Sequence, residues 1–270
     1  NSAGTGTNWY DPYGATFDHC ATVPTRGTAC VTDDPRLWCW PSGDFRLYKD
    51  SPCIDAGTNQ SWMTGASDVL GHPRICNNTA DIGADEFSAA FVSRTGGNVA
   101  PYDTWANAAT NVASAVGVAS NGYAVMLTNG VFALTNNISI TSGILVASAN
   151  GAEFSSIDGR ITYRGLAISA GAVVDGITFT GCQAVAGGSD FGGGVYCSNG
   201  VVRNCVLRNG LAMSSGGGVY IDRTGVVENC VMENNAGVVC GGGGVSLTRG
   251  GPALACRIAT NNGNNGGGII

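Results

Sequence analysis

Charged residues are scarce in this chain of 270 amino acids. Only 12% of the residues are Asp, Glu, Lys or Arg, which is about half the usual share. The net charge is −6, and Lys49 is the single lysine, so no basic stripe is available to hold a phosphate backbone. No apolar run approaches the roughly 18 residues of a membrane-spanning helix. We therefore expect neither a nucleic-acid partner nor a membrane span.

Histidine is equally scarce, with only His19 and His72, and no Cys-x-x-Cys pair is present. Zinc sites are usually built from such residues, so the sequence argues against one. We expect no cofactor. A structural Ca²⁺ at the acidic pairs Asp33–Asp34 or Asp85–Glu86 remains a minor alternative, because acidic residues more often cap helices and turns.

Glycine, by contrast, is abundant and regularly placed. Glycine triplets begin at Gly192, Gly216, Gly242 and Gly266, which are 24, 26 and 24 residues apart. A period near 25 in a chain rich in Val, Asn and Thr, without helical apolar spacing, predicts a β-solenoid. The predicted fold is therefore all-β, a parallel β-helix of about 25 residues per coil. The triplets are interpreted as tight corners rather than a phosphate loop, because neither a lysine nor a helix follows them.

Cysteines mark the same period. Relative to each repeated cysteine, the positions at minus three, zero and plus two are apolar and are expected to point inward. This core ladder comprises Val202, Cys205, Leu207, Val227, Cys230, Met232, Cys256 and Ile258, with Ala253 at the remaining position. A bend is expected at Asn204, Asn229 and Ala255, where an Asn side chain can bond nearby backbone. We favour buried free thiols here, because Cys is a good small core residue.

One helix is predicted over residues 103–117, with Asp103 or Thr104 as N-cap and Trp105 among its apolar residues. It would cover the open end of the first coil. The expected organisation is terminal coils of a β-helix in residues 1–50 and an irregular closing segment in 51–90. An entry strand and capping helix follow in 91–120, and coils in 121–270 are left open at the C-terminal end.

Four cysteines lie outside the regular repeats, in a loop-rich segment. They are Cys30, Cys39, Cys53 and Cys76. Cysteines in an irregular segment are typical of disulfide-stapled extracellular proteins, so we expect disulfides there, although the pairing cannot be deduced.

Several motifs resemble those of bacterial right-handed parallel β-helix proteins of the polymorphic outer-membrane or adhesin-like kind. Residues 51–57 (SPCIDAG), 68–74 (DVLGHPR) and 81–87 (DIGADEF), preceded by 34–37 and 44–47, resemble the end of that family's unit. Residues 91–98 (FVSRTGGN) and 105–111 (WANAATN) resemble its beginning. The resemblance implies a right-handed β-helix and a secreted or surface location, and it carries little information about activity.

The order of these motifs is reversed here, since the unit's end precedes its beginning. We interpret the chain as circularly permuted, so that a coil begun in one copy is completed by another. The expected assembly interface is Gly266, Gly267, Gly268, Ile269 and Ile270 with residues 1–23 of the next copy, including Asn1, Ser2, Phe17 and Cys20. Such a head-to-tail contact generates filaments unless its rotation happens to close a ring.

The leading functional hypothesis is a structural subunit, or one repeat unit, of an extracellular or cell-surface filament. An alternative is an adhesin that binds surface glycans, with Trp9, Tyr10, Tyr13, Trp38 and Trp40 as stacking platforms, although packing over the loop-rich end is the simpler role. A third is a polysaccharide lyase or hydrolase, for which the best candidates are Asp158, Asp175, Asp190, Arg160 and Arg164. Their spacings do not repeat, so no catalytic residue is assigned and an enzyme is not expected.

Overall fold

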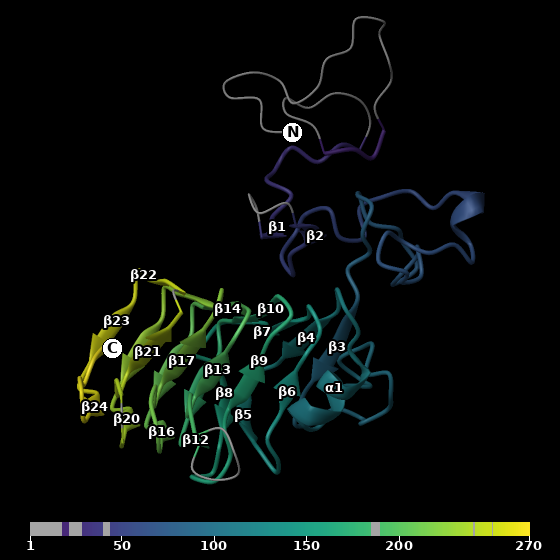
Figure 1. Ribbon diagram of the computed structural model, residues 1–270. Helices are drawn as coiled ribbons and strands as arrows, with labels where there is room; N and C mark the ends of the chain where they lie inside the picture. Colours follow the sequence, from purple (N-terminus) through teal and green to yellow (C-terminus); the bar gives the residue numbers. More distant parts are fainter. Residues whose placement is uncertain (1–17, 22–28, 40–43, 185–189, 240, 250) are drawn as a thin grey trace, which may run out of the picture. The chain divides into compact units, whose positions relative to one another are not determined.

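The computed structural model describes residues 18–21, 29–39, 44–184, 190–239, 241–249 and 251–270. The chain divides into two compact units, Asn1–Ser88 and Ala89–Ile270. The second unit is a parallel β-solenoid of about five turns, whose coils stack from α1 (Val112–Val118) to β22, β23 and β24 (Figure 1). This confirms the predicted all-β, parallel β-helix fold.

Four parallel sheets run along the solenoid, and each coil contributes a strand to most of them. The first comprises β3 (Ala89–Val92), β4 (Ala124–Leu127), β7 (Leu145–Ser148), β10 (Ala172–Asp175), β14 (Gly200–Arg203), β18 (Val226–Glu228) and β22 (Ala253–Leu254). The second comprises β5 (Gly130–Ala133), β8 (Ser155–Asp158), β11 (Thr178–Thr180), β15 (Val206–Arg208), β19 (Val231–Glu233) and β23 (Arg257–Ala259). The third comprises β6 (Ser139–Ile140), β9 (Leu166–Ile168), β13 (Val195–Cys197), β17 (Val219–Asp222) and β21 (Val245–Thr248). The fourth comprises β12 (Gln183–Ala184), β16 (Leu211–Ala212), β20 (Ala236–Gly237) and β24 (Asn262–Gly263).

The core ladder fills the interior between these sheets. Leu207 pairs with Met232, and Met232 with Ile258, so the plus-two positions stack directly along the solenoid. Leu207 and Met232 have no exposed surface, whereas Ile258 in the last coil is only partly buried. The same frame holds one coil earlier, where Ile177 and Phe179 are also buried.

The bend before each repeated cysteine is formed by a residue in the left-handed region of backbone conformation. The φ angle is 53° at Asn204, 49° at Asn229 and 50° at Ala255. Asn is among the residues that tolerate this conformation best. Its side chain does not reach the backbone as expected. Instead, Asn229 Nδ2 donates to Asn204 Oδ1 at 2.7 Å, and Asn204 Nδ2 donates to Asp175 Oδ1 at 2.9 Å, which forms a polar ladder outside the corner.

The glycine triplets are corners for two separate reasons. Gly192 and Gly216 have φ of 66° and 70°, in the region that favours glycine. At the second position of each triplet the reason is close approach, because a Cβ on Gly217 would lie 2.3 Å from the carbonyl oxygen of Ala236. The positive φ at the first position disfavours a residue with a side chain, and the close approach at the second position leaves no space for one.

A second corner contains buried asparagines that the sequence pattern did not reveal. Asn235, only 1% exposed, donates from Nδ2 to Leu207 O at 2.8 Å, and its Oδ1 accepts from Gly210 N–H at 2.9 Å. Asn261 repeats the arrangement one coil later, because its Nδ2 donates to Met232 O and its Oδ1 accepts from Asn235 N–H, both at 2.9 Å. These amides join consecutive coils where no strand pairing can.

Replacement of Asn235 by alanine should lower the free energy of unfolding by about 3 kcal/mol, because it leaves the Gly210 N–H buried without its partner and removes the hydrogen bond from the amide to the Leu207 carbonyl. Urea unfolding measures the change. Asn199→Ala is the matched control: the Asn199 side chain is exposed and its Oδ1 accepts from Thr224 Oγ1, so a loss below about 0.5 kcal/mol is expected. Equal losses in the two variants would contradict a structural role for the buried amide.

The predicted helix is shorter than expected and starts later. α1 begins after Asn111, whose side chain accepts from Ser114 N–H at 2.8 Å, so the proposed cap at Asp103 or Thr104 is wrong. The preceding residues pair with another segment instead, because Gly97 N–H donates to Ala106 O and Asn98 N–H donates to Ala108 O. Trp105 is consequently 41% exposed rather than on a buried helical face.

The first unit is irregular. β1 (Leu37–Cys39) and β2 (Asp44–Leu47) form an antiparallel pair, so this part of residues 1–50 is not a parallel coil. A single turn of 3-10 helix, η1 (Ser61–Met63), follows. Buried carboxylates fix the turns: Asp81 accepts from Asp55 N–H and Phe87 N–H at 2.6 and 2.7 Å.

None of the disulfides expected in this unit is observed among the described residues. Cys53 and Cys76 have free thiols, and the side chain of Cys39 lies outside the described residues. The structure therefore does not support an extracellular location on the basis of disulfides.

Candidate functional sites

The two ends of the solenoid differ sharply, and the end next to α1 is closed. The outer edge of β3 is covered by residues 102–109, because Phe91 N–H donates to Tyr102 O at 2.7 Å and Ala109 N–H donates to Phe91 O at 2.8 Å. The helix buries Val112 and Ala115 in the same core cluster as the coils. In the described part of the chain, the outer edge of β3 is therefore already paired rather than available to another chain.

The opposite end is open. β22, β23 and β24 each lie at the end of their sheet, and no strand among the described residues pairs with their outer edges. Residues 266–270 belong to the same coil, with Gly266 bridged to Gly242 and Ile269 to Val245. Gly244 N–H donates to Gly267 O at 3.0 Å and Val245 N–H donates to Gly268 O at 2.9 Å. The carbonyls of this glycine corner thus point back to the preceding coil, so the amides of Gly267 and Gly268 face the open side, where the next coil would lie.

Apolar side chains are exposed at this open end. Ile269 is 50% exposed and Ile270 is 43% exposed, and Leu254 on β22 is 50% exposed. Cys256 and Ile258 are partly exposed, although their counterparts in the preceding coil, Cys230 and Met232, are at most 1% exposed. We call residues 253–270 the open coil.

The first unit contains the same cysteine corner as the solenoid. His19 and Ala29, with φ of 47° and 50°, precede Cys20 and Cys30, as Asn204 and Asn229 precede their cysteines. Ala21 and Val31 form a parallel bridge, and Val31 N–H donates to Cys20 O at 2.8 Å. The corresponding bond in the solenoid, from Val231 N–H to Cys205 O, is 2.9 Å long.

Thiol hydrogen bonds extend this likeness. Cys20 Sγ donates to Asp18 O, two residues back, at 3.1 Å, and Cys230 Sγ donates to Glu228 O in the same way at 3.2 Å. Cys30, which the sequence analysis assigned to disulfides, is thus a corner residue. The other residues expected at the interface, Asn1, Ser2 and Phe17, lie outside the described residues.

The buried thiols of the solenoid are core groups rather than nucleophiles. Burial raises the pKa of Cys182 and of Cys197 to about 12 each, so both stay protonated at neutral pH. The hydrogen bond with Cys205 raises the pKa of Cys230 in the same direction. Cys205 and Cys230 are free and stack by hydrogen bonding, with Cys205 N–H donating to Cys230 Sγ at 3.4 Å.

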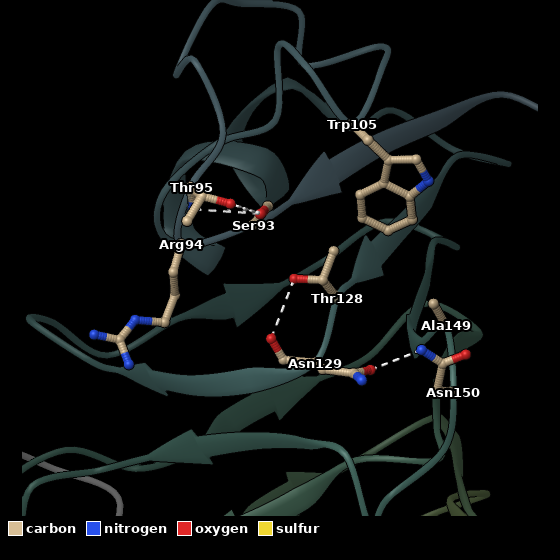
Figure 2. Close-up of a pocket in the computed structure, with 8 residues that line it drawn as sticks. All are labelled: Ser93, Arg94, Thr95, Trp105, Thr128, Asn129, Ala149 and Asn150. Atoms are coloured by element: carbon tan, nitrogen blue, oxygen red, sulfur yellow. Dashed lines mark hydrogen bonds between the residues drawn. The ribbon is translucent and has the colours of Figure 1, made fainter.

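A surface depression of about 640 Å³ lies near the closed end (Figure 2). It is lined by Ser93, Arg94, Thr95, Trp105, Thr128, Asn129, Ala149 and Asn150. Figure 2 shows Arg94 and Trp105 on opposite sides, with Asn129 and Asn150 lower in the view and their amides joined by a 2.7 Å hydrogen bond. The Trp105 ring contacts Phe91, with 4.3 Å between ring centroids, which holds the partly exposed indole in place.

One of the aromatic platforms expected from the sequence has a packing role instead. Trp38 is only 2% exposed and packs under the Arg46 guanidinium, 3.7 Å from the ring centroid, so it has a packing role. Trp9, Tyr10, Tyr13 and Trp40 lie outside the described residues. Trp105 was missed because the sequence placed it on the inner face of a helix that does not form there.

Most of the candidate enzyme residues are engaged in local contacts. Asp175 pairs with Arg203, and Asp158 Oδ1 accepts from Arg160 N–H at 2.8 Å. The Arg164 guanidinium donates to the carbonyls of Phe191 and Gly192, and its burial lowers its pKa. Asp190 differs, because its buried Oδ1 has no hydrogen-bond partner among the described residues and its charge raises the pKa of Arg164 against the effect of burial.

The acidic pairs considered for Ca²⁺ also have other roles. Asp33 and Asp34 are exposed, and Asp34 Oδ1 accepts from Arg36 N–H at 2.9 Å. Glu86 forms a buried ion pair with Arg74, so its carboxylate is engaged with that side chain rather than acting together with Asp85 as a Ca²⁺ ligand pair.

Comparisons with protein-family models, curated proteins and solved structures give no match to this chain. No helix of the described residues is long and apolar enough to cross a membrane.

Proposed function

We propose that the protein is a structural unit of an extracellular or cell-surface filament, in which one β-solenoid continues into the next copy. The observation that carries the proposal is the difference between the two solenoid ends. One end has a covered edge and the other has an open apolar coil, which gives the unit a direction. Unpaired strand edges, such as those of the open coil, are templates for another chain. We also propose membership of the bacterial right-handed β-helix family, from the resemblance of the motifs.

The partner for the open coil is proposed to be the cysteine corner of residues 18–31 in a second copy. The carbonyls of Cys205, Cys230 and Cys20 each accept a hydrogen bond from the N–H of the residue that follows the next corner cysteine. The Cys256 carbonyl occupies the equivalent position in the open coil. In the assembly, Ala21 N–H would donate to this carbonyl, as Arg257 N–H donates to Cys230 O at 2.9 Å. Continuous backbone pairing and a stacked apolar interior would then hold consecutive copies together.

Negative-stain microscopy combined with mass measurement in denaturant tests this proposal. We expect uniform filaments that separate into chains of 27.3 kDa on boiling in denaturant if the copies are separate subunits. A covalent array of many units would support the repeat-unit form of the proposal. Dispersed single chains at high concentration, with lyase activity on uronic-acid polymers, would contradict it.

A second candidate function is glycan binding at the depression around Trp105. A partly exposed indole offers a platform for a sugar ring, the amides of Asn129 and Asn150 offer donors and acceptors, and Arg94 offers a charge for a sugar carboxylate. A filament with such a depression on each copy would bind polymers with many weak sites at once.

Replacing Trp105 with alanine should weaken binding of an oligogalacturonate at least about tenfold, because the stacking surface is removed. Isothermal titration measures the affinity, with a neutral cello-oligosaccharide as the comparison ligand. Trp62→Ala is the matched control, since Trp62 is 63% exposed in the other unit and lies outside the depression. Equal loss of affinity in Trp105→Ala and Trp62→Ala would exclude this site. An absence of oligogalacturonate binding by the wild-type protein would also exclude it.

A further inference from the structure

Three ionisable side chains of the first unit converge at a place that no metal-binding motif marks. Asp68, His72 and Asp85 each offer one ligand atom, and these atoms all lie within 4.8 Å of one another. All three side chains are buried: Asp85 is 5% and His72 8% exposed, and the Asp68 side chain has no exposed surface. Asp68 Oδ2 lies 3.5 Å from His72 Nδ1. This separation is long for a hydrogen bond, and it is close to the roughly 3.3 Å edge of a tetrahedron around Zn²⁺.

The backbone holds the three residues in place without help from a ligand. Asp68 and His72 face each other across a tight loop, in which Asp68 N–H donates to His72 O at 2.7 Å and Gly71 has φ of 92°. The side chain of Asp68 fixes the loop from within, because its Oδ1 accepts from the N–H groups of Leu70 and His72, both at 2.8 Å.

A second set of bonds ties this loop to the segment that carries Asp85. Val69 N–H donates to Ala84 O at 3.0 Å, and Glu86 N–H donates to Asp68 Oδ2, also at 3.0 Å. Two ligands therefore come from one loop and the third from its bonded neighbour. Such a preorganised set of donors is what a metal site requires.

An independent observation points to a ligand. Asp85 Oδ2 accepts from Leu47 N–H at 3.3 Å, but the other carboxylate oxygen, Oδ1, is buried and has no hydrogen-bond partner among the described residues. A buried carboxylate oxygen without a partner is costly, and a bound cation would offset this cost. The neighbouring Asp68 adds a second buried carboxylate to the same space.

We propose that Asp68, His72 and Asp85 bind a first-row divalent transition-metal ion of the Zn²⁺ type. One imidazole nitrogen and two carboxylates form a ligand set for such an ion, whereas Ca²⁺ requires six to eight oxygens. The ion would join the 68–72 loop to the 84–86 segment and complete the closing part of the first unit. This site is independent of the filament proposal.

The two histidines of the chain make a direct test available. Long-range ¹H–¹⁵N spectra of the imidazoles are recorded during titration of the metal-free protein with ZnCl₂. We expect the His72 ring signals to shift and to saturate at one equivalent, while those of His19 stay unchanged. His72 signals that do not move at saturating Zn²⁺ would overturn the proposal.

Calorimetric titration of variants provides the second measurement. His72→Gln and Asp85→Asn should each weaken Zn²⁺ binding by about 100-fold or more, since each loses a ligand. His19→Gln and Asp50→Asn, at partly buried and exposed positions outside the site, should bind as the wild type does. Binding to free thiols such as Cys76 would persist in His72→Gln, so an unchanged affinity in that variant would also overturn the proposal. Circular dichroism in EDTA checks that each variant is folded.

Discussion

Replacing Gly217 with alanine is expected to destabilise the solenoid by about 3 kcal/mol or more, because the added Cβ overpacks a buried corner. The new atom would lie 2.3 Å from Ala236 O and 2.5 Å from Ala236 N, and both are backbone atoms of the next coil. The clash can be relieved only by separating two coils that are joined by hydrogen bonds on either side of the corner. Urea unfolding followed by circular dichroism measures the loss.

Gly117→Ala provides the control. Gly117 lies in α1, is exposed, and a Cβ at this position would meet nothing within 4 Å. Because alanine is the better helix former, this variant should gain about 0.5–1 kcal/mol. If Gly217→Ala behaved like Gly117→Ala, the triplets would not be close-approach corners.

Replacing Ile258 with lysine should abolish assembly while leaving the single chain folded. In an isolated copy the lysine would sit in the open coil, where its charged end can reach water. Under a stacked second copy the same charge would be buried without a partner. Since an uncompensated buried charge costs about 3–5 kcal/mol, the concentration needed for assembly should rise at least about 100-fold. Light scattering against protein concentration measures it.

Ile161→Lys makes the same chemical change on the side of the solenoid, where Ile161 is 70% exposed. Assembly of this variant should match that of the wild type. Filaments formed equally well by Ile258→Lys would show that copies do not join through the open coil. A folded, non-assembling Ile258→Lys beside an assembling Ile161→Lys would support the proposed interface.

The solenoid was predictable because its signals are local and repeat. Glycines at close-approach corners and apolar residues at fixed offsets from Cys205 and Cys230 constrain every coil alike, so the period identifies the fold from sequence alone. The strand pair formed by Val195 and Val219 follows from the same frame. At each of these positions, backbone geometry or burial restricts the residue types that can occur, so the restriction can be recognised in the sequence.

Other features depend on contacts between distant segments, which no local pattern records. The helix begins at Val112 rather than near residue 103, because Gly97 and Asn98 bond to residues 106 and 108 and hold them out of a helix. The burial of Asn235 is also set by the stacking of coils and not by its neighbours in the sequence. The convergence of His72 with Asp85 likewise requires an irregular turn, whose course is set by hydrogen bonds rather than by periodicity.

The central claim is that the open coil continues into a second copy, and a cryo-electron microscopy reconstruction of the assembled protein tests it most directly. The account predicts an uninterrupted coil stack in which Ala255–Arg257 of one copy lies about 4.8 Å from His19–Ala21 of the next, in parallel register. Particles that remain single solenoids with a solvated last coil, or filaments joined through any other surface, would contradict it.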